Sequence, residues 1–135
     1  LWNASARRRA AEASNPGIVA GTAAYRDGGP WLADALAYLD VNRRLVAERV
    51  PTEIPGARVS PLQGTYLQWI DFRDAGLPGN PRQFFFERAR VALTDGVLCG
   101  DAGAGFVRMN LATPTPILNE ILDRMANSTR ARSTT

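Results

Sequence analysis

Residues 105–125 read GFVRMNLATPTPILNEILDRM, and this stretch decides the fold of the chain. Side chains alternate between the two faces of a strand. A strand over Phe106–Leu111 therefore collects three apolar side chains on one face, those of Val107, Met109 and Leu111. A helix is expected next, with Thr115 as its cap and Pro116 at its first position. Its apolar residues recur at helical spacing, and they are Ile117, Leu118, Ile121, Leu122 and Met125. The stretch predicts a strand and a helix that bury their apolar sides.

The residues upstream extend this pattern into a layered fold. Further strands are expected at 58–60, 65–72 and 97–99. Asn80 and Gln83 have the spacing of a capping box, which predicts a helix from Pro81 to about Leu93. The strand at 65–72 is apolar on both sides, so we expect it to be central and covered on both faces. From residue 57 the order is β-β-α-β-β-α, which is typical of an α+β fold with a mixed or antiparallel sheet and helices on one face.

Two helices are expected before the first strand. The shorter one covers Ile18–Tyr25. The longer one covers residues 30–50, with Pro30 in its first turn and Pro51 at its end. Its apolar residues follow a period close to 3.6, so one side of it faces a core.

The composition is that of an ordinary globular chain, because 45% of its 135 residues are hydrophobic and 21% are charged. No apolar run is long enough to span a membrane, and no signal peptide is recognised. The first residue is Leu1, so we expect the chain to begin inside a longer gene product. The single cysteine, Cys99, excludes an intramolecular disulfide and fits a cytoplasmic location.

Two missing residue types restrict the chemistry. The chain has no histidine, which excludes a Ser-His-Asp or Cys-His nucleophile and any zinc site that needs histidine. All sixteen basic residues are arginine. Without lysine, the chain has neither a Walker-type phosphate loop nor a side chain that could form a Schiff base.

Arg108 is the most informative single residue. It lies in the middle of the strand at 106–111, on the face that also carries Phe106 and Asn110. A guanidinium group binds a carboxylate through two parallel hydrogen bonds, which suits the carboxylate of an amino acid. Two other readings remain open at this point, a solvated arginine on an edge strand and an internal ion pair.

Four other features are weaker candidates. Gly64 could allow a ligand close to the backbone, or it could simply start a strand. The loop at 100–105 is rich in glycine, but it precedes a strand, so a hairpin connection is favoured over a phosphate site. Cys99 is expected to be a small buried residue. The basic segments at 7–9 and 130–132 are interpreted as solvated ends, so no nucleic-acid partner is expected.

Four separated blocks of the sequence resemble one known family in the same order. They are AAYRDGGPWLADALAYLDVNRRLVAERVP at 23–51, GARVSPLQGTYLQWIDFR at 56–73, FERARVALTDG at 86–96 and GAGFVRMNLATPTPILNEILDRM at 103–125. Together they resemble the C-terminal stretch of the MalY/PatB-type cystathionine β-lyases, within the fold-type I superfamily of class I/II aminotransferases. The resemblance extends over about residues 14–126.

The resemblance implies roles for particular residues. Arg108 matches the arginine that holds the α-carboxylate of the substrate, with Asn110 beside it in the same block. Gly64 and Tyr66 match the entry to a strand where the small domain meets the active site. The cofactor of the family is pyridoxal phosphate, which is bound to a lysine of the large domain, and the usual assembly is a homodimer.

The resemblance also implies a domain organisation. Residues 1–29 would be a remnant of the large domain with an N-terminal helix, residues 30–127 the small domain, and residues 128–135 a disordered tail. The helix at 30–50 would link the two domains. The cofactor lysine and phosphate-binding residues would precede Leu1, so this chain alone is expected to be inactive.

Two positions depart from the pattern of the family, since Gln63 often matches glutamate and Cys99 an aromatic residue. The activity implied is a carbon–sulfur β-lyase that converts a cystathionine-like amino acid into a thiol, pyruvate and ammonia. An aminotransferase of the same superfamily and a free-standing, non-catalytic interaction domain remain the alternatives.

Overall fold

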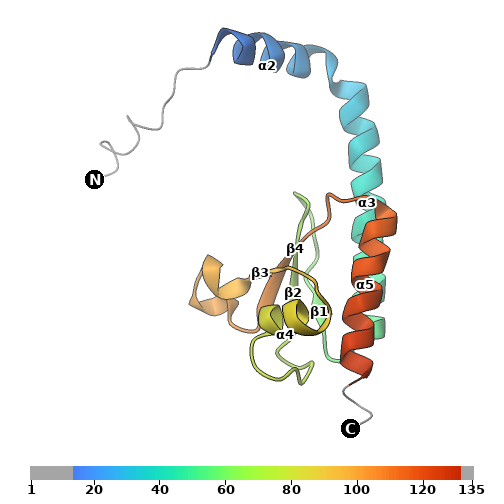
Figure 1. Ribbon diagram of the computed structural model, residues 1–135. Coiled ribbons are helices and arrows are strands. Elements are labelled where there is room, and N and C mark those ends of the chain that lie inside the picture. The colour runs from blue at the N-terminus through green and yellow to red at the C-terminus, as the bar shows by residue number, and fades with distance from the viewer. Residues whose placement is uncertain (1–13, 132–135) are drawn as a thin grey trace, which may run out of the picture. The chain divides into compact units, whose positions relative to one another are not determined.

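The computed structural model describes residues 14–131, and the chain divides into two compact units between Ala37 and Tyr38 (Figure 1). Helix α2 spans Asn15–Asp27, and its N-cap Ser14 accepts a hydrogen bond from the backbone N–H of Gly17 at 3.3 Å. The helix expected at 18–25 is therefore confirmed and is longer than expected. None of the α2 residues is buried. No described helix is both long and apolar enough to cross a membrane.

The second unit is built on a four-stranded antiparallel sheet. Its strands are β1 (Arg58–Val59), β2 (Leu67–Asp71), β3 (Thr94–Asp95) and β4 (Phe106–Asn110). They lie in the order β1-β2-β4-β3, so β2 and β4 are the two central strands. The antiparallel form of the α+β prediction is confirmed.

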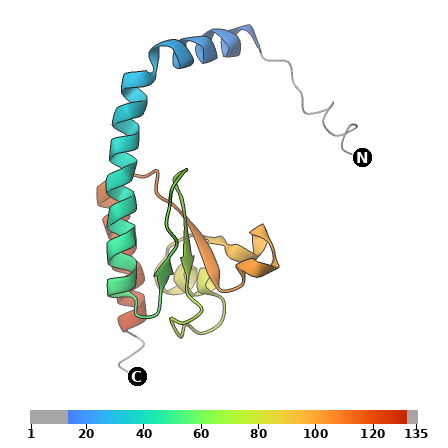
Figure 2. The same ribbon diagram turned by 180° about the vertical axis from the view of Figure 1, so that it is seen from behind.

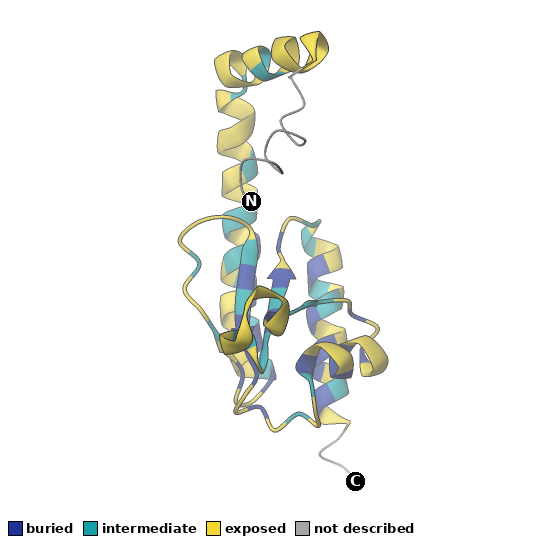
Figure 3. Ribbon diagram, turned by 90° about the vertical axis from the view of Figure 1, so that its left-hand side faces the viewer, coloured by how far each residue is buried: buried dark blue, intermediate teal, exposed yellow. Residues whose placement is uncertain are grey.

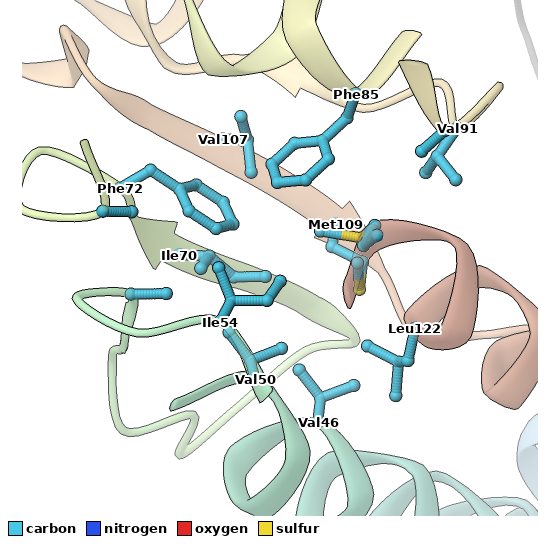
Figure 4. Packing of buried hydrophobic residues seen from close by; sticks show 14 of the residues in the cluster. Val46, Val50, Ile54, Ile70, Phe72, Phe85, Val91, Val107, Met109 and Leu122 are labelled. Carbon is cyan, nitrogen blue, oxygen red and sulfur yellow. The ribbon is translucent and has the colours of Figure 1, made fainter. Parts of the chain in front are cut away.

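Three helices cover one face of this sheet, which we call the inner face. They are α3 (Gly29–Glu53, of which the part from Tyr38 on belongs to this unit), α4 (Pro81–Arg88) and α5 (Thr115–Arg130). Figure 4 shows Val46 and Val50 of α3, Phe85 of α4 and Leu122 of α5 directed at the inner side chains of β2 and β4. Ile70 and Val107, which are cross-strand partners, are completely buried there.

The opposite, outer face is less covered. Along β2 the buried residues Gln68 and Ile70 alternate with Leu67 and Trp69, which are half-buried (Figure 3). The expectation that this strand is covered on both faces is therefore wrong for the described part of the chain. The outer face is covered only in part, since Asp71 at the end of β2 is buried while Leu67 and Trp69 are not.

Two helix ends differ from their predictions. Helix α3 continues through Pro51 to Glu53, because Ile54 follows Val50 by one turn and both side chains are buried in the core. Helix α4 ends at Arg88, several residues early, since Arg90 adopts a left-handed φ of 56° that a helix cannot contain. The capping box is half formed: Asn80 accepts from the N–H of Gln83 at 3.1 Å, but the Gln83 side chain bonds Glu87.

The strand expected at 97–99 is wrong. The segment forms a 3-10 helix, Gly96–Cys99, and a second one follows at Asp101–Gly103. The side chain of Asp95 caps the first of them by accepting from the Val97 N–H at 3.2 Å. The two turns pack so closely that a Cβ on Gly96 would lie 2.2 Å from the carbonyl oxygen of Gly103.

The last helix also differs at both ends. Pro114 rather than Thr115 occupies its N-cap position, and the helix extends to Arg130. Residues 128–130, which we expected to begin a disordered tail, are thus helical. Residues 1–13 and 132–135, which include the basic segment at 7–9, lie outside the described residues.

Candidate functional site

The outer face of the sheet brings together three side chains from its central strands. Trp69 of β2 is the cross-strand partner of Arg108 of β4, and Phe106 lies two residues before Arg108 on the same face. The rings of Trp69 and Phe106 meet edge to face, with their centroids 6.2 Å apart. Strand alternation and sheet register together therefore place a guanidinium group beside an aromatic pair.

Arg108 has no acidic partner among residues 14–131. The one hydrogen-bond contact of its side chain in that range is to Cys99, whose Sγ lies 3.9 Å from Nη1. The strand that carries it is central, because β4 lies between β2 and β3. Within residues 14–131, neither the edge-strand reading nor the ion-pair reading fits these observations.

A neighbouring arginine is fully engaged, in contrast. Arg73 donates from Nε and Nη2 to the two carboxylate oxygens of Asp71 at 2.9 and 2.7 Å. Its guanidinium carbon lies 4.7 Å from the centre of the Phe106 ring. The hydrogen bonds from Arg73 lower the pKa of the Asp71 carboxyl. Because Asp71 is paired in this way, it does not compete for Arg108.

A hollow of about 270 Å³ opens beside Arg108 on the outer face. It is lined by Ser60, Trp69, Gly96, Cys99, Ala102, Gly103 and Phe106. The two 3-10 helices that form one wall lie on the side of the sheet away from α3 and α5 (Figures 1 and 2). Cys99 is exposed there, so the expectation of a buried cysteine is wrong.

The other residues expected at the site lie at its margin. Asn110 is on the same strand face as Arg108, but it is exposed, and its Oδ1 accepts from the Ala112 N–H at 2.8 Å. Gly64 and Tyr66 are exposed in the segment that leads into β2. A Cβ added to Gly64 would meet no described atom within 4 Å.

The sequence alone did not indicate that Trp69 and Phe106 form a pair, or that a hollow lies beside them. Trp69 and Phe106 occur on the expected strands, but only the register of β2 against β4 brings them to Arg108. The 3-10 helices that form the wall were read as strand and loop. Among the described residues, no group of His, Cys, Asp and Glu side chains could hold a metal ion.

Comparison with known proteins gives a consistent result. No family model matches the chain. It is 40% identical over 128 residues to a Mycobacterium leprae protein that carries a cystathionine β-lyase name, and the match covers 85% of this chain and 32% of that protein. It is 34% identical over 122 residues to protein MalY of Escherichia coli, covering 87% of this chain and 31% of MalY.

Solved structures agree with these relatives. A Corynebacterium diphtheriae structure that carries a β-cystathionase name superposes with a TM-score of 0.83 at 45% identity, covering 87% of this chain and 31% of the other. Cystalysin from Treponema denticola, whose crystal structure contains pyridoxal 5′-phosphate, gives a TM-score of 0.81 at 30% identity, with coverages of 87% and 30%. The chain spans about a third of the length of these relatives, and it belongs to the family of MalY/PatB-type cystathionine β-lyases.

Proposed function

We propose that this chain is the substrate-carboxylate-binding part of a pyridoxal-phosphate-dependent carbon–sulfur β-lyase. The full-length enzyme would act on a cystathionine-like amino acid and release a thiol, pyruvate and ammonia. One observation carries the proposal: Arg108 stands on a central strand, beside an open hollow, without an acidic partner among the described residues.

The cofactor would be bound largely by residues outside this stretch. None of the 135 residues is a lysine, so the covalent anchor of pyridoxal phosphate must come from elsewhere in the full-length protein. When bound, pyridoxal phosphate supplies an electron sink for the charge left as the substrate loses its Cα proton. The residues present here fit the substrate carboxylate rather than the cofactor.

Arg108 would bind and orient the substrate. Two of its N–H groups would donate to the two oxygens of the α-carboxylate, which fixes the position and rotation of the Cα atom. It would not transfer a proton, because guanidinium groups stay charged in proteins. Asn110, Gly64 and Tyr66 would line the approach to this carboxylate, and their exposure is compatible with that role.

The proposed function implies a domain organisation for the full-length enzyme. Residues 1–29 would belong with the large domain, 30–127 would form the small domain and 128–135 would follow it. Helix α2 and the first half of α3 expose apolar side chains, such as those of Val19, Trp31 and Leu36. This exposure supports the proposal that another part of the full-length protein covers these helices. The intact enzyme would be a cytoplasmic homodimer without nucleic-acid or membrane partners.

The test uses the full-length protein that carries this stretch. With cystathionine as substrate, Arg108→Ala is expected to lower kcat/KM by about 100- to 1,000-fold, the loss of two charge-assisted hydrogen bonds. Arg108→Lys should recover part of that loss, since it restores the charge without the paired geometry. Arg88→Ala, which removes an exposed arginine of α4, is the matched control and should stay within twofold of the wild type.

Product analysis separates the alternatives. Pyruvate release without exchange against a keto acid supports the lyase. Keto-acid exchange without pyruvate supports an aminotransferase, to which the chain is also similar, for example at 31% identity to an aspartate aminotransferase of Pyrococcus abyssi. If neither pyruvate nor keto-acid exchange is observed, the result supports a non-catalytic domain. An Arg108→Ala variant with wild-type kinetics would refute the carboxylate role.

A further inference from the structure

The hollow beside Arg108 has an uncharged lining. Two aromatic rings, those of Trp69 and Phe106, form one side, and the 3-10 helices with Cys99 form the other. None of the lining residues is acidic or basic. A neighbouring charged pair, Arg73 with Asp71, is internally satisfied, and Arg73 lies against the Phe106 ring. A charged group placed against this lining would lose water and find no charged side chain among the lining residues, whereas an apolar group would gain contacts.

The size of the hollow suits a substituent as large as an aromatic ring. A cavity of about 150 Å³ lined by apolar side chains accommodates benzene. The volume here, about 270 Å³, therefore leaves room for a phenyl ring with one or two additional carbons. Ring faces such as those of Trp69 and Phe106 favour contacts with apolar and aromatic groups.

The hollow is also within reach of a substrate held by Arg108. In an S-substituted cysteine the sulfur is three bonds from the carboxylate carbon, a distance of about 4 Å at ordinary bond lengths. Cys99, which lines the hollow, has its Sγ 3.9 Å from Nη1 of Arg108. A carboxylate on Arg108 and a substituent in the hollow can thus belong to one small molecule.

We propose that this hollow is a specificity pocket for the group carried on the substrate sulfur, and that it selects uncharged S-alkyl and S-benzyl cysteines over substrates whose sulfur substituent ends in charges. The inference rests on the proposed lyase function and deepens it. Cystathionine, whose distal end carries an ammonium and a carboxylate, would then be the poorer substrate.

The first experiment measures pyruvate release by the full-length enzyme from S-benzylcysteine and from cystathionine. The kcat/KM ratio of the two is expected to favour S-benzylcysteine by at least about tenfold, the usual scale of discrimination by an apolar pocket. Cys99→Phe, which fills the hollow, should lower the kcat/KM for S-benzylcysteine relative to S-methylcysteine by at least about tenfold. Ser60→Arg, which adds a cation to the lining, should move the preference toward cystathionine.

Leu98→Phe is the matched control for the filling variant. Leu98 is an exposed neighbour of Cys99 that does not line the hollow, so the same ring added there should leave the substrate ratios unchanged. If the enzyme releases pyruvate but Cys99→Phe and Ser60→Arg leave the ratios as in the wild type, the pocket assignment is overturned while the lyase function stands. If no S-substituted cysteine yields pyruvate, both the pocket assignment and the proposed lyase function are refuted.

Discussion

The two faces of the central sheet differ sharply although the same strands build them. On the inner face Ile70 and Val107 are completely buried under α3, α4 and α5. One residue along each strand, on the outer face, Trp69 and Arg108 are only half-buried. The inner face is a packed core, and the outer face carries aromatic rings and a guanidinium group that has no acidic partner within residues 14–131.

This difference separates stability from function within single strands. Close-packed apolar side chains stabilise a fold, and their loss leaves cavities. Half-exposed aromatic and charged groups contribute less to folding, and they are typical of surfaces that bind a ligand or another domain. Substitutions on the two faces should therefore have separable effects on stability and on function.

The largest expected effect comes from a matched pair of phenylalanines. Phe85 is completely buried on the inner side, and Phe106 lies half-exposed on the outer face. Phe85→Ala should lower the free energy of unfolding by about 3–5 kcal/mol. Phe106→Ala should cost no more than about 1.5 kcal/mol, because less of its surface is removed from water. Urea denaturation of the 135-residue chain measures both, and equal losses would mean that the outer face is part of the core.

The contrast between buried and exposed positions can also be tested with a polar side chain, Asn42. Asn42 of α3 is completely buried, and its Nδ2 donates to the carbonyl oxygens of Leu111 and Thr113, each at 2.9 Å. Its Oδ1 accepts from the Thr115 hydroxyl at 2.8 Å. Asn42→Ala leaves these buried groups unpaired and should cost about 1–3 kcal/mol.

The control for this prediction is Asn127→Ala, which truncates an exposed asparagine in the last turn of α5. It should change the unfolding free energy by less than about 0.5 kcal/mol. The two variants would be compared in the same denaturant titration. Equal and small losses would show that the Asn42 contacts do not stabilise the segment after β4.

Alternation and periodicity predicted much of the inner face, although Ile117, expected in the buried stripe of α5, is 49% exposed. Val107 and Met109 were placed on the buried side of their strand from sequence alone, and Leu118 and Leu122 on the buried side of α5, because short-range geometry fixes those faces. The same alternation put Arg108 on the opposite side. Whether Arg108 had an acidic partner depended on the tertiary arrangement, which no local pattern specifies.

The 3-10 helices show where local reasoning fails. Val97, Leu98 and Cys99 have apolar, strand-like character, yet the close approach of Gly96 to Gly103 and the Asp95 cap turn the segment into 3-10 helices. That approach joins residues on both sides of a loop, so its consequence, a wall beside Trp69, was not visible in the sequence. The sequence thus singled out Arg108, but it did not reveal the apolar lining of the hollow beside it.

The smallest expected effect concerns the ion pair at the edge of the outer face. Arg73 lowers the pKa of Asp71 from its ordinary value of 3.8, so the pair stabilises the fold above that pH and loses this contribution as the pH falls through the lower, folded-state pKa. Because Arg73 is largely solvent-exposed, Asp71→Asn should cost less than about 1 kcal/mol at neutral pH. Urea titrations of wild type and variant should differ by a constant amount above about pH 5 and converge in more acidic solution. A difference that grows as the pH falls would mean that Asp71 is stabilised in its protonated form, and that the outer face holds a different charge balance from the one described.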